Sequence, residues 1–241
     1  MTFDPFGDFA TRGYLRNLAG EKDPDIVRRL EHTSFMTGIQ EAFDRLGTVE
    51  RLGYQNVLET HLALFEAVYP WAGQDRLQTA PDLAVSKGPV LFAYPKDIRR
   101  AVDFALDIGQ DKTLMRRKPG EVMGYLAYGH PFLDGNGRAI MVLHAVLAQR
   151  AGFSIDWAAT DKAEYLSALT HELDSPGEGY LDAYLKPFVR GYLTGERLID
   201  QVSHAPGLDG STGQNKVLGK TDDPALQARY AQQELKRRQL R

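Results

Sequence analysis

The chain has 241 residues, 43% hydrophobic and 25% charged, which is the balance of a globular protein with a sizeable core. Its 29 Lys and Arg nearly cancel its 32 Asp and Glu, and the net charge of −3 argues against nucleic acid as a partner, because phosphate-binding surfaces normally show a basic excess. The absence of cysteine excludes disulfides and thiolate chemistry.

No stretch approaches the roughly 18 consecutive apolar residues of a membrane span. The first residues, MTFDPFGDFATRG, lack the basic and apolar regions of a signal peptide. We therefore expect a cytoplasmic protein without a membrane partner, and leave open its export into a host cell as an effector.

Helical patterns follow one another along most of the chain. The first begins after Asp23-Pro24, an N-cap followed by a favoured first helical residue, and its apolar residues recur at three- and four-residue spacing until Gly47. Further helices are predicted over residues 57–68, 95–108, 121–128, 137–151, 161–173 and 180–193. The chain is therefore expected to be mainly helical.

Residues 74–94 break this pattern. Short apolar pieces flank Gly88 and Pro89, which indicates a small β-hairpin or an extended flap between two helices.

The composition changes again from about Asp200. Residues 205–215, APGLDGSTGQN, are small and polar and predict a linker or mobile loop. Residues 224–241 predict one more helix, whose basic end suits the negative end of the helix dipole. We expect a domain over residues 1–195, followed by a flexible linker and basic helix over 196–241. Whether that helix is simply solvated or docks a partner stays open.

Residues 130–138, HPFLDGNGR, precede one of the predicted helices. Gly135 and Gly137 permit backbone conformations in which N–H groups converge on an anion, and the helix N-terminus adds a favourable dipole. Arg138 can bind phosphate oxygens with its fork of donors, and Asn136 can donate from its amide. This half of the motif predicts a phosphate site.

The other half supplies a base and a metal ligand. Asp134 offers the hard oxygen that Mg²⁺ takes from a single carboxylate beside substrate phosphates. His130 has the side chain whose ordinary pKa suits base catalysis near neutrality. Together the nine residues predict a phosphoryl- or nucleotidyl-transfer site.

The stretch resembles the motif of the Fic family, H-P-F-x-[D/E]-G-N-G-R-x-x-R, at every position up to Arg138. Residues 60–76, THLALFEAVYPWAGQDR, and 86–93, SKGPVLFA, resemble the family's preceding helix and its flap. The resemblance covers roughly residues 5–195. It implies an all-α helical bundle with a small β-hairpin flap at about 80–94 over the active site, and transfer of a nucleotide, usually AMP from ATP, to a protein hydroxyl.

Carried over by position, the resemblance makes His130 the general base that deprotonates a Ser, Thr or Tyr of a target protein. Asp134 holds Mg²⁺ between the α- and β-phosphates. The implied anion hole consists of Gly135, Asn136, Gly137 and Arg138. The target is expected to add as a strand to the flap, at Val85, Val90, Leu91 and Phe92.

The sequence departs from the family at position 141, where Met141 replaces an arginine that normally meets the γ-phosphate. We expect another cation, such as the flap residue Lys87, to hold the triphosphate end. The alternatives are another donor (UTP, GTP, CTP or a diphosphate compound) or a weak enzyme. From a different class, a catalytically idle module that binds nucleotide and peptide also stays open.

Relatives in the family are silenced by a helix with the pattern [S/T]-x-x-x-E-[G/N]. Only residues 37–41 and 160–164 have the Ser/Thr and Glu spacing, and neither is followed by Gly or Asn. Any inhibitor is therefore expected on a separate antitoxin chain, as in a toxin–antitoxin pair.

Two further histidines are expected to serve packing. His61 lies on the apolar face of its predicted helix, and His144 follows the motif by about two turns. Trp71 and Arg76 are expected to support the flap, with a phosphate contact by Arg76 as the alternative.

Overall fold

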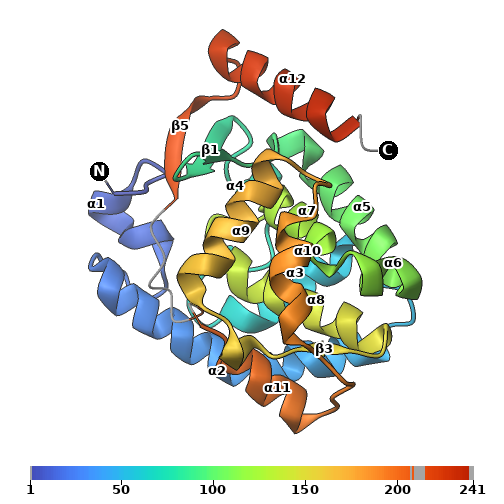
Figure 1. Ribbon diagram of the computed structural model, residues 1–241. Helices are drawn as coiled ribbons and strands as arrows, with labels where there is room; N and C mark the ends of the chain where they lie inside the picture. The colour runs from blue at the N-terminus through green and yellow to red at the C-terminus, as the bar shows by residue number, and fades with distance from the viewer. Residues whose placement is uncertain (1, 207, 209–214, 239–241) are drawn as a thin grey trace.

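The computed structural model describes residues 2–206, 208 and 215–238 and shows a helical bundle with a small sheet at one end (Figure 1). The longer helices are α2 (Pro24–Thr48), α3 (Tyr54–Phe65), α5 (Ile98–Gln110), α7 (Pro119–Gly129), α8 (Asn136–Arg150), α9 (Lys162–Asp174), α11 (Glu196–Ser203) and α12 (Pro224–Arg238). Short helices are α1 (Phe9–Arg12), α4 (Arg76–Thr79), α6 (Lys112–Arg117) and α10 (Tyr180–Leu185). Single 3₁₀ turns are η1 (Tyr14–Arg16), η2 (Pro95–Asp97), η3 (Trp157–Ala159) and η4 (Lys186–Phe188).

Helix α8 forms the centre of the bundle and packs against α2, α3, α5 and α7. Helix α2 begins as the sequence predicts, since the Asp23 side chain accepts from the Asp25 N–H and Pro24 takes the first position. It crosses α3 at Gly38, where a Cβ would lie 2.0 Å from the Ala63 carbonyl oxygen. A residue without a side chain is therefore needed at this crossing.

The sheet beside the bundle has three strands in the order β2-β1-β5. Strands β1 (Leu83–Lys87) and β2 (Val90–Leu91) form an antiparallel hairpin, hereafter the flap, and Gly88 turns between them with φ +55°. Strand β5 (Lys216–Lys220) pairs antiparallel with the other edge of β1. A separate two-stranded ladder joins β3 (Ser154–Ile155) and β4 (Val189–Arg190).

Helix α12 packs on the outer side of the flap, and Figure 1 shows it beyond β1 and β5. Its Leu226 and Tyr230 form a small apolar cluster with Ala84 and Leu91 of the flap. The C-terminal part of the chain is thus fixed to the flap through both a strand and a helix.

The structure confirms the predicted fold class, an all-α bundle with a small β-hairpin. The predicted helix over 180–193 is wrong in its second half, because Pro187 interrupts it and residues 186–190 form η4 and β4. Of the predicted linker over 205–215, residues 207 and 209–214 lie outside the described residues. Strand β5, directly after it, was not predicted. Among the described residues no helix is long and apolar enough to cross a membrane.

Candidate functional site

The motif HPFLDGNGR connects α7 to α8. Helix α7 ends at Gly129, and His130 caps it in the left-handed conformation with φ 42° and ψ 58°. Gly135, also left-handed at φ 76°, leads into α8 at Asn136. The loop therefore projects His130 and the N-terminus of α8 toward the same space.

That space is a cavity of about 450 Å³. Its walls come from α2, the flap, the motif loop, α8, α9 and the C-terminal segment. Most of the predicted site residues line it: His130, Asp134, Gly135, Asn136, Gly137, Arg138, Lys87, Val90 and Phe92. Val85 and Leu91 do not.

His130 lies against the flap at the cavity wall. Its ring stacks on Phe92 with centroids 3.5 Å apart and planes 3° from parallel. Burial lowers the pKa of His130 well below its ordinary value, and the positive charges of Arg76 and Lys87 lower it further. The imidazole is therefore neutral near pH 7, as a proton acceptor must be.

The tautomer of His130 follows from Asn215. The Asn215 amide nitrogen lies 2.8 Å from the Leu133 carbonyl oxygen and 3.2 Å from His130 Nε2. An amide nitrogen can only donate, so Nε2 accepts and carries the lone pair. The ring nitrogen beside Asn215 is thus the basic one.

Arg76 holds the backbone at the end of α7. Its guanidinium donates to the carbonyls of His130 (2.7 Å), Ala93 (2.9 Å) and Gly129 (3.3 Å), and it is completely buried. Its backbone N–H donates to Pro131. Arg76 therefore fixes the position of His130 and its link to the flap, and it is not among the residues that line the cavity.

The rest of the motif loop is held by hydrogen bonds between its own residues. The Asn136 amide accepts from the Phe132 N–H at 2.9 Å and donates to the Phe132 carbonyl at 2.7 Å. Both of its amide atoms are thus used within the loop, and what Asn136 offers an anion is its main-chain N–H at the start of α8.

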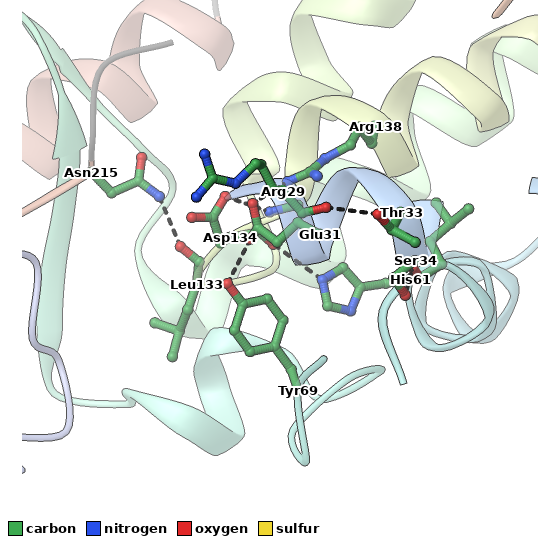
Figure 2. A network of polar contacts seen from close by, with 12 residues as sticks. Arg29, Glu31, Thr33, Ser34, His61, Tyr69, Leu133, Asp134, Arg138 and Asn215 are labelled. Carbon is green, nitrogen blue, oxygen red and sulfur yellow. Dashed lines mark hydrogen bonds and ion pairs between the residues drawn. The ribbon is translucent and has the colours of Figure 1, made fainter. Parts of the chain in front are cut away.

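His61 supports the loop from below (Figure 2). Its Nδ1 accepts from the Gly73 N–H at 3.0 Å, so its Nε2 donates to the Asp134 carbonyl at 3.1 Å. The ring stacks on Phe132 at 3.7 Å, and burial lowers the pKa of His61 to about 3. His61 is a neutral structural histidine that holds the main-chain carbonyl of Asp134, the predicted metal ligand.

Arg138 carries the site's most buried ion pair (Figure 2). It donates to Glu31 of α2 at 2.8 Å, the Tyr69 hydroxyl donates to the other Glu31 oxygen, and the guanidinium lies over the Phe65 ring at 4.7 Å. Burial and the charge of Asp134 raise the pKa of Glu31, while Arg138 opposes the rise. Arg138 also lines the cavity, and its Nη1 atom is buried without a hydrogen-bond partner.

Glu31 is a site residue that the sequence prediction missed. A signal existed, because Glu31 lies four residues after Val27 and four before Phe35, on the buried face of α2. A charged residue on an apolar stripe indicates a partner inside the protein.

Asp134 has the features of a residue that binds a metal ion together with a substrate. One of its oxygens accepts the Gly135 N–H at 2.7 Å, and its carboxylate lines the cavity. Among the described residues no group of three or more His, Asp or Glu could enclose a metal. A single carboxylate fits Mg²⁺ that arrives with nucleotide phosphates as its other ligands.

Two lysines and a methionine also line the cavity. Lys87 at the end of β1 and Lys162 at the start of α9 both line it. Burial lowers the pKa of Lys87, the Asp134 carboxylate raises it, and Arg138 and Lys162 lower it. Met141 lies on the cavity wall, 4% exposed, where the family pattern has arginine.

The flap residues predicted to bind a target are all buried. Phe92 stacks on His130, Leu91 packs against α12, and Val85 belongs to the main core. The outer edge of β1 pairs with β5. Asn215, directly before β5, is a second cavity residue that sequence reasoning missed, and nothing in the local pattern indicated it.

Residues 51–148 of the chain match the Fic/DOC family. Over 176 residues the chain is 30% identical to the protein adenylyltransferase VbhT of Bartonella schoenbuchensis. The aligned stretch covers 68% of this chain and 35% of that protein. Over 164 residues it is 27% identical to a Sinorhizobium fredii protein named "Probable protein adenylyltransferase y4lH", which covers 64% of this chain and 81% of that protein. The chain thus spans about a third of the first relative's length.

Solved structures share the fold. The N-terminal Fic domain of a VirB-translocated Bep effector protein from Bartonella quintana, with bound ADP, matches at a TM-score of 0.61 and 18% identity, over 80% of this chain and 97% of that one. BepC from Bartonella tribocorum, with bound AMPPNP, matches at a TM-score of 0.57 and 18% identity. The match covers 73% of this chain and 92% of that one. At these identities the likeness establishes the fold.

Proposed function

This chain contains a Fic domain of the Fic/DOC family, and on that premise we propose that it is a protein nucleotidyltransferase. It transfers AMP from ATP to a Ser, Thr or Tyr hydroxyl of a target protein. The two curated relatives are named as adenylyltransferases, and two structures of the same fold hold ADP or AMPPNP.

The observation that carries the proposal is the state of His130. Its Nε2 carries the lone pair, which accepts a hydrogen bond from Asn215, and its pKa is lowered well below the ordinary value. At neutral pH it can therefore take the proton of an incoming hydroxyl that replaces Asn215. The hydroxyl oxygen then attacks the α-phosphorus, and pyrophosphate leaves.

The phosphates are bound at the N-terminus of α8. The main-chain N–H groups of Asn136 and Gly137 begin that helix, and the cationic side chain of Arg138 lines the cavity beside them. Mg²⁺ held by Asp134 supplies charge neutralisation on the phosphates when it is bound. Lys87 and Lys162 are the cavity cations that we assign to the terminal phosphates, in place of an arginine at 141.

The donor deserves a separate test because of Met141. An apolar thioether cannot hold a γ-phosphate, so a diphosphate compound, in which no γ-phosphate needs a ligand, is the second candidate donor. Another nucleotide (UTP, GTP or CTP) is tested beside it. We also propose that a separate antitoxin chain completes a toxin–antitoxin pair, and that the protein is made in the cytoplasm.

The experiment is intact-mass analysis of the protein incubated with cell lysate, Mg²⁺ and one nucleotide at a time. The expected result is a target protein heavier by one AMP with ATP, absent for His130→Ala. His171→Ala, at an exposed histidine of α9, is the matched control that keeps activity. If the adduct forms with a different nucleotide, that nucleotide is the donor. Nucleotide binding with no adduct from any donor overturns the transferase and favours an idle binding module.

A further inference from the structure

Strand β5 occupies an edge of the flap that the hairpin itself leaves open. Its residues pair antiparallel with β1, with Leu83 opposite Lys220 and Ser86 opposite Lys216, and the register shifts between Ala84 and Val85. The pairing is made by main-chain groups. Val217 and Leu218 of β5 are 38% and 42% exposed, so the strand contributes little to the core.

The residue directly before β5 enters the cavity. Asn215 is 8% exposed, and its amide nitrogen bridges the Leu133 carbonyl and the basic Nε2 of His130. Figure 2 shows it reaching Leu133 on the opposite side of the loop from His61. Its Oδ1 is buried without a hydrogen-bond partner. The contact with His130 is thus made, but the side chain is incompletely satisfied.

We propose that residues 215–220 are a built-in surrogate of the acceptor: they occupy the strand-binding edge of β1 and present Asn215 to His130 where an acceptor hydroxyl belongs. This inference rests on the proposed function. It assigns the β1 edge as the site for an extended peptide segment of the target, antiparallel to β1, with the acceptor residue directly before the paired stretch.

The chemistry explains why the surrogate stays unmodified. A hydroxyl at this place would give its proton to His130 Nε2, its oxygen would bond to the α-phosphorus, and pyrophosphate would leave. The Asn215 amide nitrogen has no lone pair available for attack, because it is delocalised into the carbonyl. Asn215 therefore blocks the base without becoming a product.

Helix α12 keeps the surrogate in place. Arg100 of α5 binds Glu234 through two hydrogen bonds of 2.7 and 2.8 Å, and Gln233 donates to the Leu91 carbonyl at 2.9 Å. A segment tethered in this way has an effective concentration on the order of millimolar. A target must therefore displace β5, which its exposed side chains and unsatisfied Asn215 make feasible without unfolding the core.

The test uses full-length Val217→Pro, which breaks β5 at an exposed position, with Val217→Ala as its matched control. The probe is a labelled synthetic peptide of residues 213–222, added in trans. We expect Val217→Pro to bind it at least about tenfold more tightly than the wild type or Val217→Ala, because the tethered competitor is gone. Equal binding by all three, or binding by none, overturns the proposal.

The acceptor position is tested with peptides of the same length in which Asn215 is replaced by Ser, Thr or Tyr. With Mg-ATP, Val217→Pro should add one AMP to at least one of them at that residue, and none to the parent peptide. Transfer to lysate proteins but to none of these peptides overturns the acceptor assignment. Tight peptide binding with no transfer to any protein or peptide supports strand exchange and overturns the transferase function instead.

A reversible lock makes the test independent of a folding defect. The chain has no cysteine, so the double variant Leu83→Cys, Lys220→Cys carries one possible disulfide across β1 and β5, at directly paired positions. The oxidised protein should modify the hydroxyl peptide at least about tenfold more slowly than the same sample after reduction. Equal rates in both states overturn the proposal.

Discussion

The carboxylate of Glu31 lies 2.8 Å from the guanidinium of Arg138, and the two side chains are 2% and 5% exposed. Glu31→Ala leaves the arginine buried without a counter-charge, and we expect a loss of about 3–5 kcal/mol in the free energy of unfolding. Glu31→Gln retains an oxygen for the Tyr69 hydroxyl and should lose less. Urea denaturation of both variants measures the difference. Equal losses would mean that the charge of Glu31, and not its hydrogen bond with the Tyr69 hydroxyl, accounts for its contribution to stability.

The same pair limits nucleotide binding. Glu31 places a negative charge beside the predicted phosphate site and occupies one donor of Arg138. Glu31→Gln removes that charge while the side-chain shape stays similar, so ATP affinity should rise by about tenfold, equivalent to ~1.4 kcal/mol. Isothermal titration calorimetry measures it. Weaker ATP binding by Glu31→Gln would show that Glu31 positions Arg138 for the phosphates.

Substitution by alanine should change the stability of the protein in opposite directions at two glycines of the motif. At Gly135 a Cβ would lie 2.5 Å from the Phe65 ring and 3.0 Å from His61 Nε2, and φ is +76°. Gly135→Ala should therefore destabilise the loop and lower the melting temperature. At Gly137 a Cβ meets nothing within 4 Å, and the position lies inside α8. Gly137→Ala should gain about 0.5–1 kcal/mol of stability.

Nucleotide binding separates these two variants further. Gly137 lines the cavity, so the added methyl group of Gly137→Ala enters the space assigned to phosphates. We expect a folded, slightly more stable protein with weaker ATP affinity, measured on the same samples as the melting curves. Unchanged affinity would place the phosphates elsewhere in the cavity.

Lys87 and Lys162, which we assign to the terminal phosphates, should make the wild type prefer ATP over ADP. Met141 adds no ionic contact, because its side chain is an apolar thioether. Met141→Arg should widen the preference for ATP by about tenfold or more, since a hydrogen bond to a charged group contributes about 1.5–3 kcal/mol. Isothermal titration calorimetry with each nucleotide measures both preferences. Equal affinity of the wild type for ATP and ADP would show that neither lysine holds the terminal phosphate.

Stability should depend on pH through the buried histidines. Burial lowers the pKa of His61 to about 3 and that of His144 to about 4, from 6.5. The unfolded chain binds these protons from pH 6.5 downward while the folded chain does not. Stability is therefore fully present above pH 6.5 and falls by about 1.4 kcal/mol per pH unit for each histidine toward the folded pKa values.

His61→Gln should remove the contribution of one histidine to the pH dependence of stability. Urea denaturation at pH 7.5, 6.5 and 5.5 gives the slope, and the variant should be less stable at pH 7.5 but lose less stability on acidification. An unchanged slope would mean that His61 is protonated in the folded protein, contrary to its acceptor role toward the Gly73 N–H.

The helices and the motif loop could be predicted because their signals are local. Apolar spacing and the Asp23-Pro24 cap predict α2, and Gly88 with Pro89 predicts the flap turn. The motif predicts that His130 and the α8 N-terminus share one cavity, and the structure brings them together. Periodicity and turn chemistry depend on neighbouring residues, which the sequence shows directly.

The missed features depend on pairing between distant segments. Strand β5 has five residues and lies mostly exposed, so it carries no alternating pattern to detect. Asn215 becomes a site residue only because β5 pairs with β1 far away in the sequence. The Asn136 amide was expected on a phosphate, but its bonds to Phe132 could be known only from the loop conformation.

The three strands of the sheet come from distant parts of the chain, and this affects the order of folding. The β1–β2 hairpin closes over a two-residue turn, whereas the β1–β5 ladder must bring together residues from the first half and the end of the chain. Local contacts form before distant ones, so β5 should pair last. During synthesis the helical bundle can be complete while the β1 edge is still bare. An unpaired edge strand invites association with other chains, so the newly made protein should be most prone to aggregation just before residues 216–238 emerge.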